Sequence, residues 1–288
     1  LYFISFFLTG LKTKLPNKFS KTFAKHKILN EISSDKILKS IFDTPIINAK
    51  INEEKLKLYS ENKNLDFNYY KEKNLIRLDF DSQKLVENKL ISEFATNPYW
   101  AGEVKKILGT KPYFVGIDAW LTLPPYKKMN NYDDIGNYVS SQMWHRDCDN
   151  LRDIKIMTYL TDVKNLDTGP FEIVTGTNKF TFFNPFKYLM GSAMRVQDHY
   201  VQKKFKNSIY SFLGNKGESM IADTRALHRG KTITDQNSYR VILQFYFSNH
   251  TFGKVKYLKL PTKNSESYEI WINSFDRDDC NYKSLFNR

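Results

Sequence analysis

The stretch that decides the fold runs from residue 140 to residue 174 and reads SSQMWHRDCDNLRDIKIMTYLTDVKNLDTGPFEIV. Its apolar, β-branched and aromatic residues form short or alternating runs, and Asp, Asn, Gly and Pro separate these runs. Short runs of this kind between turn residues are typical of β-strands. We therefore expect strands at residues 140–145, 155–163 and 171–174.

The same pattern continues on both sides and predicts further strands at residues 114–123, 218–222 and 239–248. Six or more strands without long helices between them favour an antiparallel sandwich or barrel over a doubly wound parallel sheet. Helical spacing of apolar residues instead predicts helices at 34–42, 82–94 and 101–108, and a helix or lid within 197–212. The predicted fold class is therefore mainly β, with N-terminal and flanking α-helices.

The chain has 288 residues, of which 41% are hydrophobic and 15% aromatic, so it is long and apolar enough to bury a full core. We expect residues 1–75, rich in Lys, Asn and Glu, to form a helical, partly mobile extension. Residues 76–260 form the β-rich domain with its flanking helices. Residues 261–288 form a polar tail that packs outside the sheet.

The charge balance of 44 basic and 31 acidic residues gives a net charge of +13. Such a charge suits nucleic acid, anionic lipid or an anionic small molecule as partner. An AT-rich genome explains many of the lysines equally well, because Asn, Ile, Phe and Tyr are also abundant. Residues 201–260, which carry part of the chemistry discussed below, hold 11 basic and 3 acidic residues.

The two cysteines, Cys148 and Cys280, lie too far apart for a zinc cluster or a disulfide framework. This usage favours a reducing, cytoplasmic location. The apolar run at residues 1–11 is too short to span a bilayer, and no basic region precedes it. We therefore expect a cytoplasmic protein without a membrane span; the oligomeric state is left open.

The tripeptide His145-Arg146-Asp147 ends a predicted strand, where side chains two residues apart share one face and can grip one metal ion. A lone pair of this kind is more often a surface pair. A second histidine, His228, follows another predicted strand, and Arg240 opens the apolar strand after it. Two imidazoles and a carboxylate match the facial triad of non-haem Fe(II) oxygenases. A guanidinium can bind the distal carboxylate of a 2-oxo acid in a bidentate fork.

The ordered set of these motifs resembles the phytanoyl-CoA dioxygenase family of Fe(II)/2-oxoglutarate-dependent oxygenases over about residues 75–250. The motifs that carry the resemblance are Trp144-His145-Arg146-Asp147, residues 155–163, Gly169-Pro170-Phe171-Glu172, His228-Arg229-Gly230 and Arg240. The resemblance implies a double-stranded β-helix, or jelly roll, with His145, Asp147 and His228 as iron ligands and Arg240 as the 2-oxoglutarate anchor. Residues 175–178 read Thr-Gly-Thr-Asn where many members carry Pro-Gly-Ser-His.

Thr158 and Tyr159, which stand close to these motifs, are predicted to contact 2-oxoglutarate or to support the metal ligands. The resemblance further implies an enzyme that uses Fe(II), 2-oxoglutarate and dioxygen, and releases succinate and carbon dioxide. Because related halogenases carry a small residue at the position of Asp147, a carboxylate there favours a hydroxylase. Its expected substrate is an aliphatic C–H bond of a small, anionic metabolite.

Two alternatives stay open. An oxygenase acting on nucleic acid would fit the positive charge and the many aromatic residues, although no repeated basic and aromatic interleaving supports it. A non-catalytic jelly-roll module could keep the metal site as a relic, although a structural metal site more usually closes its coordination shell with protein ligands.

Overall fold

The computed structural model describes residues 23–27, 31–46, 77–109, 112–125, 140–147, 153–178 and 195–248. The strands are β1 (Phe23–Lys27), β2 (Arg77–Asp79), β3 (Tyr113–Thr122), β4 (Asp153–Tyr159), β5 (Phe171–Val174), β6 (Ile209–Phe212), β7 (Glu218–Asp223), β8 (His228–Gly230) and β9 (Arg240–Ser248). The α-helices are α2 (Glu31–Phe42), α5 (Ser82–Glu87), α6 (Lys89–Ala95), α7 (Pro98–Leu108) and α10 (Asp198–Phe205).

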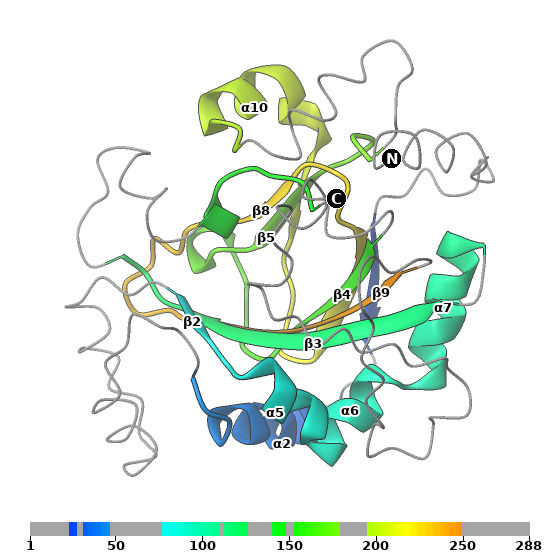
Figure 1. The fold of residues 1–288 in the computed structure, drawn as a ribbon. Helices are drawn as coiled ribbons and strands as arrows, with labels where there is room; N and C mark the ends of the chain where they lie inside the picture. Colours follow the sequence, from blue (N-terminus) through cyan, green and yellow to red (C-terminus); the bar gives the residue numbers. More distant parts are fainter. Residues whose placement is uncertain are drawn as a thin grey trace, which may run out of the picture.

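The strands form two antiparallel sheets. The large sheet has the order β1-β7-β4-β9-β3-β2, and the small sheet has the order β6-β5-β8. Figure 1 shows α2, α5 and α6 beneath the large sheet, the small sheet above it, and α10 beyond the small sheet. This arrangement confirms a mainly β fold with flanking helices. The central strands β4 and β9 have the helices on one side of the large sheet and the small sheet on the other.

Successive side chains of β4 pack on opposite faces of the large sheet, as the two-residue period of a strand requires. Ile154 and Ile156 belong to the core beneath the helices, whereas Met157 and Tyr159 belong to the core between the two sheets. Full burial of a large apolar side chain stabilises a fold by about 1.5–3 kcal/mol. Both faces of the central strand therefore contribute to stability, and the face between the sheets leads to the site described below.

The predicted helix at 82–94 is two helices that meet at Asn88. The Asn88 residue ends α5 with an extended backbone, and its side-chain oxygen accepts a hydrogen bond from the amide of Ile91 at the start of α6. Asparagine favours such caps because its side chain replaces a missing backbone partner. The expected end of α7 at Gly109 is confirmed, since Gly109 adopts the left-handed conformation with φ 72°.

The predicted strand at 140–145 is wrong. Residues Ser140–Gln142 form a 3₁₀ turn, and after it Trp144 and His145 make only single bridges, to Val196 and His228. The segment 197–212 contains α10, a 3₁₀ turn at Lys206–Ser208 and β6. The sequence analysis also missed β1, β2, β6 and β8, since three to five residues give only a weak periodic pattern, although the equally short β5 was predicted.

The described part of the first 75 residues packs on the core. Strand β1 forms the edge of the large sheet beside β7, and α2 contributes the buried Ile37 and Ile41. The helical expectation is therefore wrong for residues 23–27. The expected tail at 261–288 lies outside the described residues. None of the helices in the described part of the chain has the length and hydropathy needed to cross a bilayer.

Candidate metal centre and anion site

Backbone hydrogen bonds bring the two predicted histidine ligands together. The amide of His145 donates to the carbonyl of His228 at 2.9 Å, and the amide of His228 donates to the carbonyl of His145 at 2.9 Å. The imidazole ring centroids consequently lie 4.3 Å apart. The pairing joins the segment after the first 3₁₀ turn to β8, so residues 83 positions apart in sequence become neighbours.

Both imidazoles are oriented by their own chain. The Nδ1 atom of His145 lies 2.7 Å from the carbonyl oxygen of Met143, and that of His228 lies 2.9 Å from the carbonyl oxygen of Ala226. A carbonyl only accepts, so each Nδ1 carries the proton and each Nε2 keeps a lone pair for a metal. The Nε2 atoms lie 3.8 Å and 3.4 Å from the carboxylate oxygens of Asp147.

The ligand atoms of His145, Asp147 and His228 all lie within 4.8 Å of one another, so this group can hold a metal ion. Burial and the neighbouring His228 lower the pKa of His145 to about 3. Burial raises the pKa of Asp147, but the charge of Lys155 and the contact with His228 outweigh it and leave that pKa well below its usual value. Metal binding needs a neutral imidazole and an ionised carboxylate, and near neutral pH both residues are in these forms.

The site includes Lys155, to which the sequence analysis assigned no role. Its Nζ atom lies 2.7 Å from Oδ2 of Asp147, and its side chain is 12% exposed. Lys155 lies on the same face of β4 as Met157 and Tyr159, between the two sheets. In the sequence, the one available sign of this role was that Lys155 is a charged residue within an apolar strand.

Arg240 begins β9, directly opposite Thr122 of β3 in the sheet register. Its side chain is 2% exposed, and within the described part of the chain its Nε and Nη1 atoms have no hydrogen-bond partner. Nη2 donates to the Thr122 hydroxyl at 3.4 Å. Burial lowers the pKa of Arg240 to about 10. A buried cation with idle donors is costly in free energy, and an anion with two oxygens would relieve that cost.

Gly230 provides the space for this guanidinium. It lies two residues after His228 on β8, so both residues face the same side of the strand. A Cβ atom on Gly230 would lie only 2.9 Å from Nη2 of Arg240. Two residues of strand span about 7 Å. A short dicarboxylate can therefore reach from the histidine ligand to the guanidinium.

Thr158 and Tyr159 point in different directions. The Thr158 hydroxyl lies 2.7 Å from that of Ser219 on β7, on the face of β4 opposite Lys155, so the structure does not bring Thr158 to the site. The Tyr159 hydroxyl donates to the carbonyl of Phe212 and accepts from the amide of Phe171, both at 2.9 Å. Burial raises its pKa to about 12. Tyr159 therefore connects β4 to both β5 and β6.

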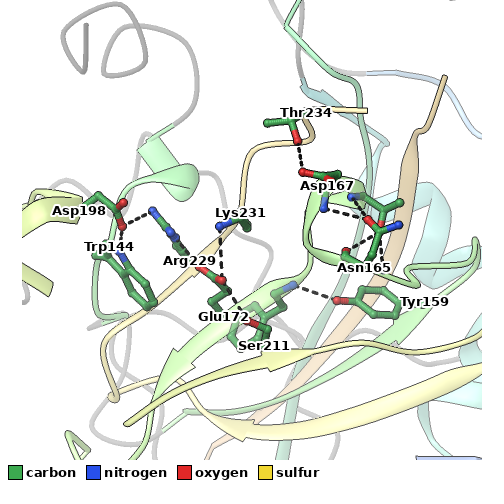
Figure 2. Close-up of polar contacts among 12 residues, drawn as sticks. Trp144, Tyr159, Asn165, Asp167, Glu172, Asp198, Ser211, Arg229, Lys231 and Thr234 are labelled. Atoms are coloured by element: carbon green, nitrogen blue, oxygen red, sulfur yellow. Dashed lines mark hydrogen bonds and ion pairs between the residues drawn. The ribbon is translucent and has the colours of Figure 1, made fainter. Parts of the chain in front are cut away.

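A buried ion network flanks the metal centre (Figure 2). The Nε atom of Arg229 lies 2.7 Å from Glu172, and its Nη1 atom lies 2.8 Å from Asp198 of α10. The indole of Trp144 donates to the same Asp198 oxygen at 2.8 Å and stacks under the Arg229 guanidinium. Because Trp144 precedes one histidine ligand and Arg229 follows the other, the network anchors both ligand segments.

The residues at 175–178, where the sequence departs from the family pattern, lie beside the metal centre. Asn178 donates from its side-chain amide to Asp223 at 3.1 Å, and Arg225 pairs with the same carboxylate at 2.6 Å. The Arg146 guanidinium donates to the carbonyl oxygens of Thr177 and Arg225. The carbonyl groups of Thr177 and Arg225 therefore hold the Arg146 guanidinium, and Asp223 holds that of Arg225.

No protein-family model and no curated protein matches the sequence. Solved structures do match the fold. HygX from Streptomyces hygroscopicus, with nickel and 2-oxoglutarate bound, is 9% identical with a TM-score of 0.53, and the match covers 88% of this chain and 92% of HygX. The non-heme alpha ketoglutarate dependent carbocyclase SnoK from nogalamycin biosynthesis is 10% identical with a TM-score of 0.50, over 81% of this chain and 84% of SnoK.

A third match is ThoJ, a non-heme monooxygenase in its apo form. It is 12% identical with a TM-score of 0.50, and the match covers 93% of this chain and 92% of ThoJ. At sequence identities this low, the similarity to these three proteins concerns the fold of the backbone and not the side chains. The chain therefore has the fold shared by HygX, SnoK and ThoJ.

Proposed function

We propose that this protein is an Fe(II)/2-oxoglutarate-dependent dioxygenase with a double-stranded β-helix core. His145, Asp147 and His228 hold the iron, and Arg240 binds the distal carboxylate of 2-oxoglutarate. The division into an N-terminal extension up to residue 75, an oxygenase domain up to residue 260 and a C-terminal tail belongs to the same proposal, as does membership of the phytanoyl-CoA dioxygenase family. The matched structures of HygX with 2-oxoglutarate bound and of the alpha ketoglutarate dependent carbocyclase SnoK support the reaction class.

The observation that carries the proposal is the idle guanidinium of Arg240. Two of its donor atoms, Nε and Nη1, are buried and have no partner among the residues that the structure describes, and the guanidinium occupies the space that Gly230 leaves on the strand of His228. A purely structural arginine would be paired with an acid, as Arg229 is with Glu172. The arrangement fits a ligand with one carboxylate at the arginine and a second group at the metal, as 2-oxoglutarate has.

In this proposal the iron and 2-oxoglutarate together supply the oxidising power for cleaving an unactivated C–H bond. The protein positions the participants. His145 and His228 present Nε2 lone pairs, since their Nδ1 protons are bound to backbone carbonyls. Asp147 supplies the anionic ligand, and its carboxylate favours hydroxylation over halogenation. The apolar walls of the two sheets, including Phe171 stacked on His228, limit access of water.

The proposed substrate is a small, anionic metabolite. Basic groups gather near the triad: Arg146 is bonded to neighbouring carbonyls, and Arg195 lies close enough to help lower the pKa of His145. A positive surround of this kind favours a carboxylate or phosphate group on the substrate. HygX has been solved with hygromycin B bound, which supports a small molecule rather than nucleic acid as substrate.

The decisive experiment is anaerobic addition of Fe(II) and then 2-oxoglutarate to the metal-free protein, with absorption spectra recorded at each step. The visible charge-transfer band of an Fe(II)–2-oxo acid chelate is expected in the wild-type protein. The matched variant Arg240→Met should bind Fe(II) equally well, because it leaves the triad intact, and should show the band only at much higher 2-oxoglutarate concentration.

Tight Fe(II) binding without the band in the wild-type protein would contradict the proposal. It would instead favour the non-catalytic metal-binding module. An appearance of the band would lead to a screen of anionic metabolites for substrate-dependent formation of succinate.

A further inference from the structure

Lys155 makes the shortest ion pair at the metal centre. Its Nζ atom lies 2.7 Å from Oδ2 of Asp147, whereas the nearer histidine atom, Nε2 of His228, lies 3.4 Å from the same oxygen. The other oxygen, Oδ1, lies 3.8 Å from Nε2 of His145. The ammonium group therefore pairs with Oδ2, which also faces the imidazole of His228, whereas Oδ1 faces the imidazole of His145.

The large sheet fixes the direction of Lys155. It lies in the middle of the three central strands, opposite Ala222 of β7 on one side and Tyr246 of β9 on the other. Ala222 is small enough to leave room for the lysine, and the Tyr246 ring centroid lies 5.5 Å from the ammonium. These neighbours hold the side chain toward Asp147 and make the contact a fixed part of the site.

A carboxylate can bind a metal through one oxygen or through both. In a facial triad, three positions of a six-coordinate metal stay open only when the carboxylate uses one oxygen. A 2-oxo acid chelate needs two of these positions, and dioxygen needs the third. A carboxylate that spread over two positions would compete with the chelate.

We propose that Lys155 is a positioning residue that holds Oδ2 of Asp147, so that the carboxylate binds the metal through Oδ1 alone and leaves room for 2-oxoglutarate. This inference rests on the proposed function above. It gives a role to a residue that neither ligates the metal nor contacts the distal carboxylate of the cosubstrate.

The proposal predicts that removing the Lys155 ammonium affects metal affinity and 2-oxoglutarate affinity differently. Removing the ammonium in Lys155→Met removes a positive charge beside the metal and frees a second carboxylate oxygen, so metal affinity is unchanged or increases. The affinity of the loaded protein for 2-oxoglutarate falls about tenfold or more, in the range found when the support of a metal ligand is lost. Simple damage to the fold would weaken both.

The test uses the full chain and isothermal titration calorimetry with Ni(II), followed by 2-oxoglutarate, so no turnover is needed. Lys155→Met is compared with Lys155→Arg, which keeps a cation, and with Lys216→Met. The control removes the same group from an ion pair of equal length, Lys216 with Asp35, that is remote from the metal centre. We expect Lys155→Arg to recover most of the 2-oxoglutarate affinity and Lys216→Met to match the wild-type protein.

Wild-type 2-oxoglutarate affinity in Lys155→Met would overturn the proposal. Loss of Ni(II) binding in that variant would also overturn it, because Lys155 would then build the site instead of directing the carboxylate. An arginine variant as weak as the methionine variant would show that the cation is not the cause. If the nickel-loaded wild-type protein itself fails to bind 2-oxoglutarate, the proposed function fails, and this outcome is separate from the other three.

Discussion

Two buried arginines, one on a strand of each sheet, differ sharply in their surroundings. Arg229 of β8 is 7% exposed and pairs with two carboxylates, those of Glu172 and Asp198. Arg240 of β9 is 2% exposed, and no acidic side chain among the described residues forms an ion pair with it. The Arg229 guanidinium therefore joins the segments around it in an ion network, whereas the Arg240 guanidinium keeps donor atoms that could bind an anion.

The lowered pKa of Arg240 reflects the free-energy cost of burying this cation. A fall from 12.5 to about 10 means that folding disfavours the charged form by about 3 kcal/mol. The folded pKa lies below the unfolded one, so this cost is fully present at neutral pH and diminishes only as the pH rises through 10. Proteins retain such a cost at functional sites, where a ligand offsets it.

The largest expected effect concerns the paired arginine. Arg229→Met leaves Glu172, which is 3% exposed, buried without its main partner, so we expect the free energy of unfolding to fall by about 3–5 kcal/mol. Urea denaturation followed by circular dichroism measures this loss. The exposed pair of Lys84 and Glu87 supplies the control, since the solvent screens this pair and Lys84→Met should leave the free energy of unfolding nearly unchanged. Equal losses in the two variants would remove the distinction between a buried network and a surface pair.

Arg240→Met should have the opposite effect on stability. Because no buried acid loses its partner, the free energy of unfolding of the metal-free protein should rise by about 1–3 kcal/mol. Affinity for 2-oxoglutarate should fall about 100-fold or more, with metal affinity unchanged. Denaturation and calorimetry on the same preparation measure both quantities. Destabilisation comparable to that of Arg229→Met would show that Arg240 is a structural residue.

A smaller effect is expected at the glycine beneath Arg240. In Gly230→Ala the new methyl group would meet Nη2 at 2.9 Å and displace the guanidinium, so 2-oxoglutarate should bind about tenfold more weakly while the triad keeps its metal. Gly102→Ala in α7 is the matched control, because nothing lies within 4 Å of its Cβ position. That variant should be up to about 1 kcal/mol more stable and bind 2-oxoglutarate normally.

The sequence predicted the ligands better than the strands that carry them. His145, Asp147 and His228 were identifiable as candidate ligands because metal ligation restricts residue types and spacing, and the structure brings them together as a group that could hold a metal ion. The local backbone at 140–145 was mispredicted, because the pairing of His145 with His228 depends on a partner 83 residues away. Tertiary pairing of this kind leaves no periodic signal in a short segment.

Lys155 and the Arg229 network illustrate what one sequence cannot reveal. Lysine is usually exposed, so the sequence did not show that the Lys155 side chain points between the two sheets. The register with Ala222 and Tyr246 shows it. Arg229 and Asp198 come from segments whose contact depends on the placement of α10. The orientation of these charged side chains therefore depends on how the strands and α10 pack together, which the strand pattern in the sequence does not reveal.

The smallest expected effect tests the role of Tyr159, which the sequence associated with the cosubstrate. Its hydroxyl already bonds to Phe212 and Phe171, so Tyr159→Phe should lower the free energy of unfolding by about 1 kcal/mol through the two lost hydrogen bonds. Affinity for 2-oxoglutarate should stay within about twofold of the wild-type value, because the Arg240 donors and the triad are unchanged. Thermal denaturation and calorimetry measure the two effects. A large loss of 2-oxoglutarate affinity at unchanged stability would instead place the Tyr159 hydroxyl in the anion site beside Arg240. The anion site would then contain two polar side chains, Arg240 and Tyr159, in contrast to the internally paired Arg229.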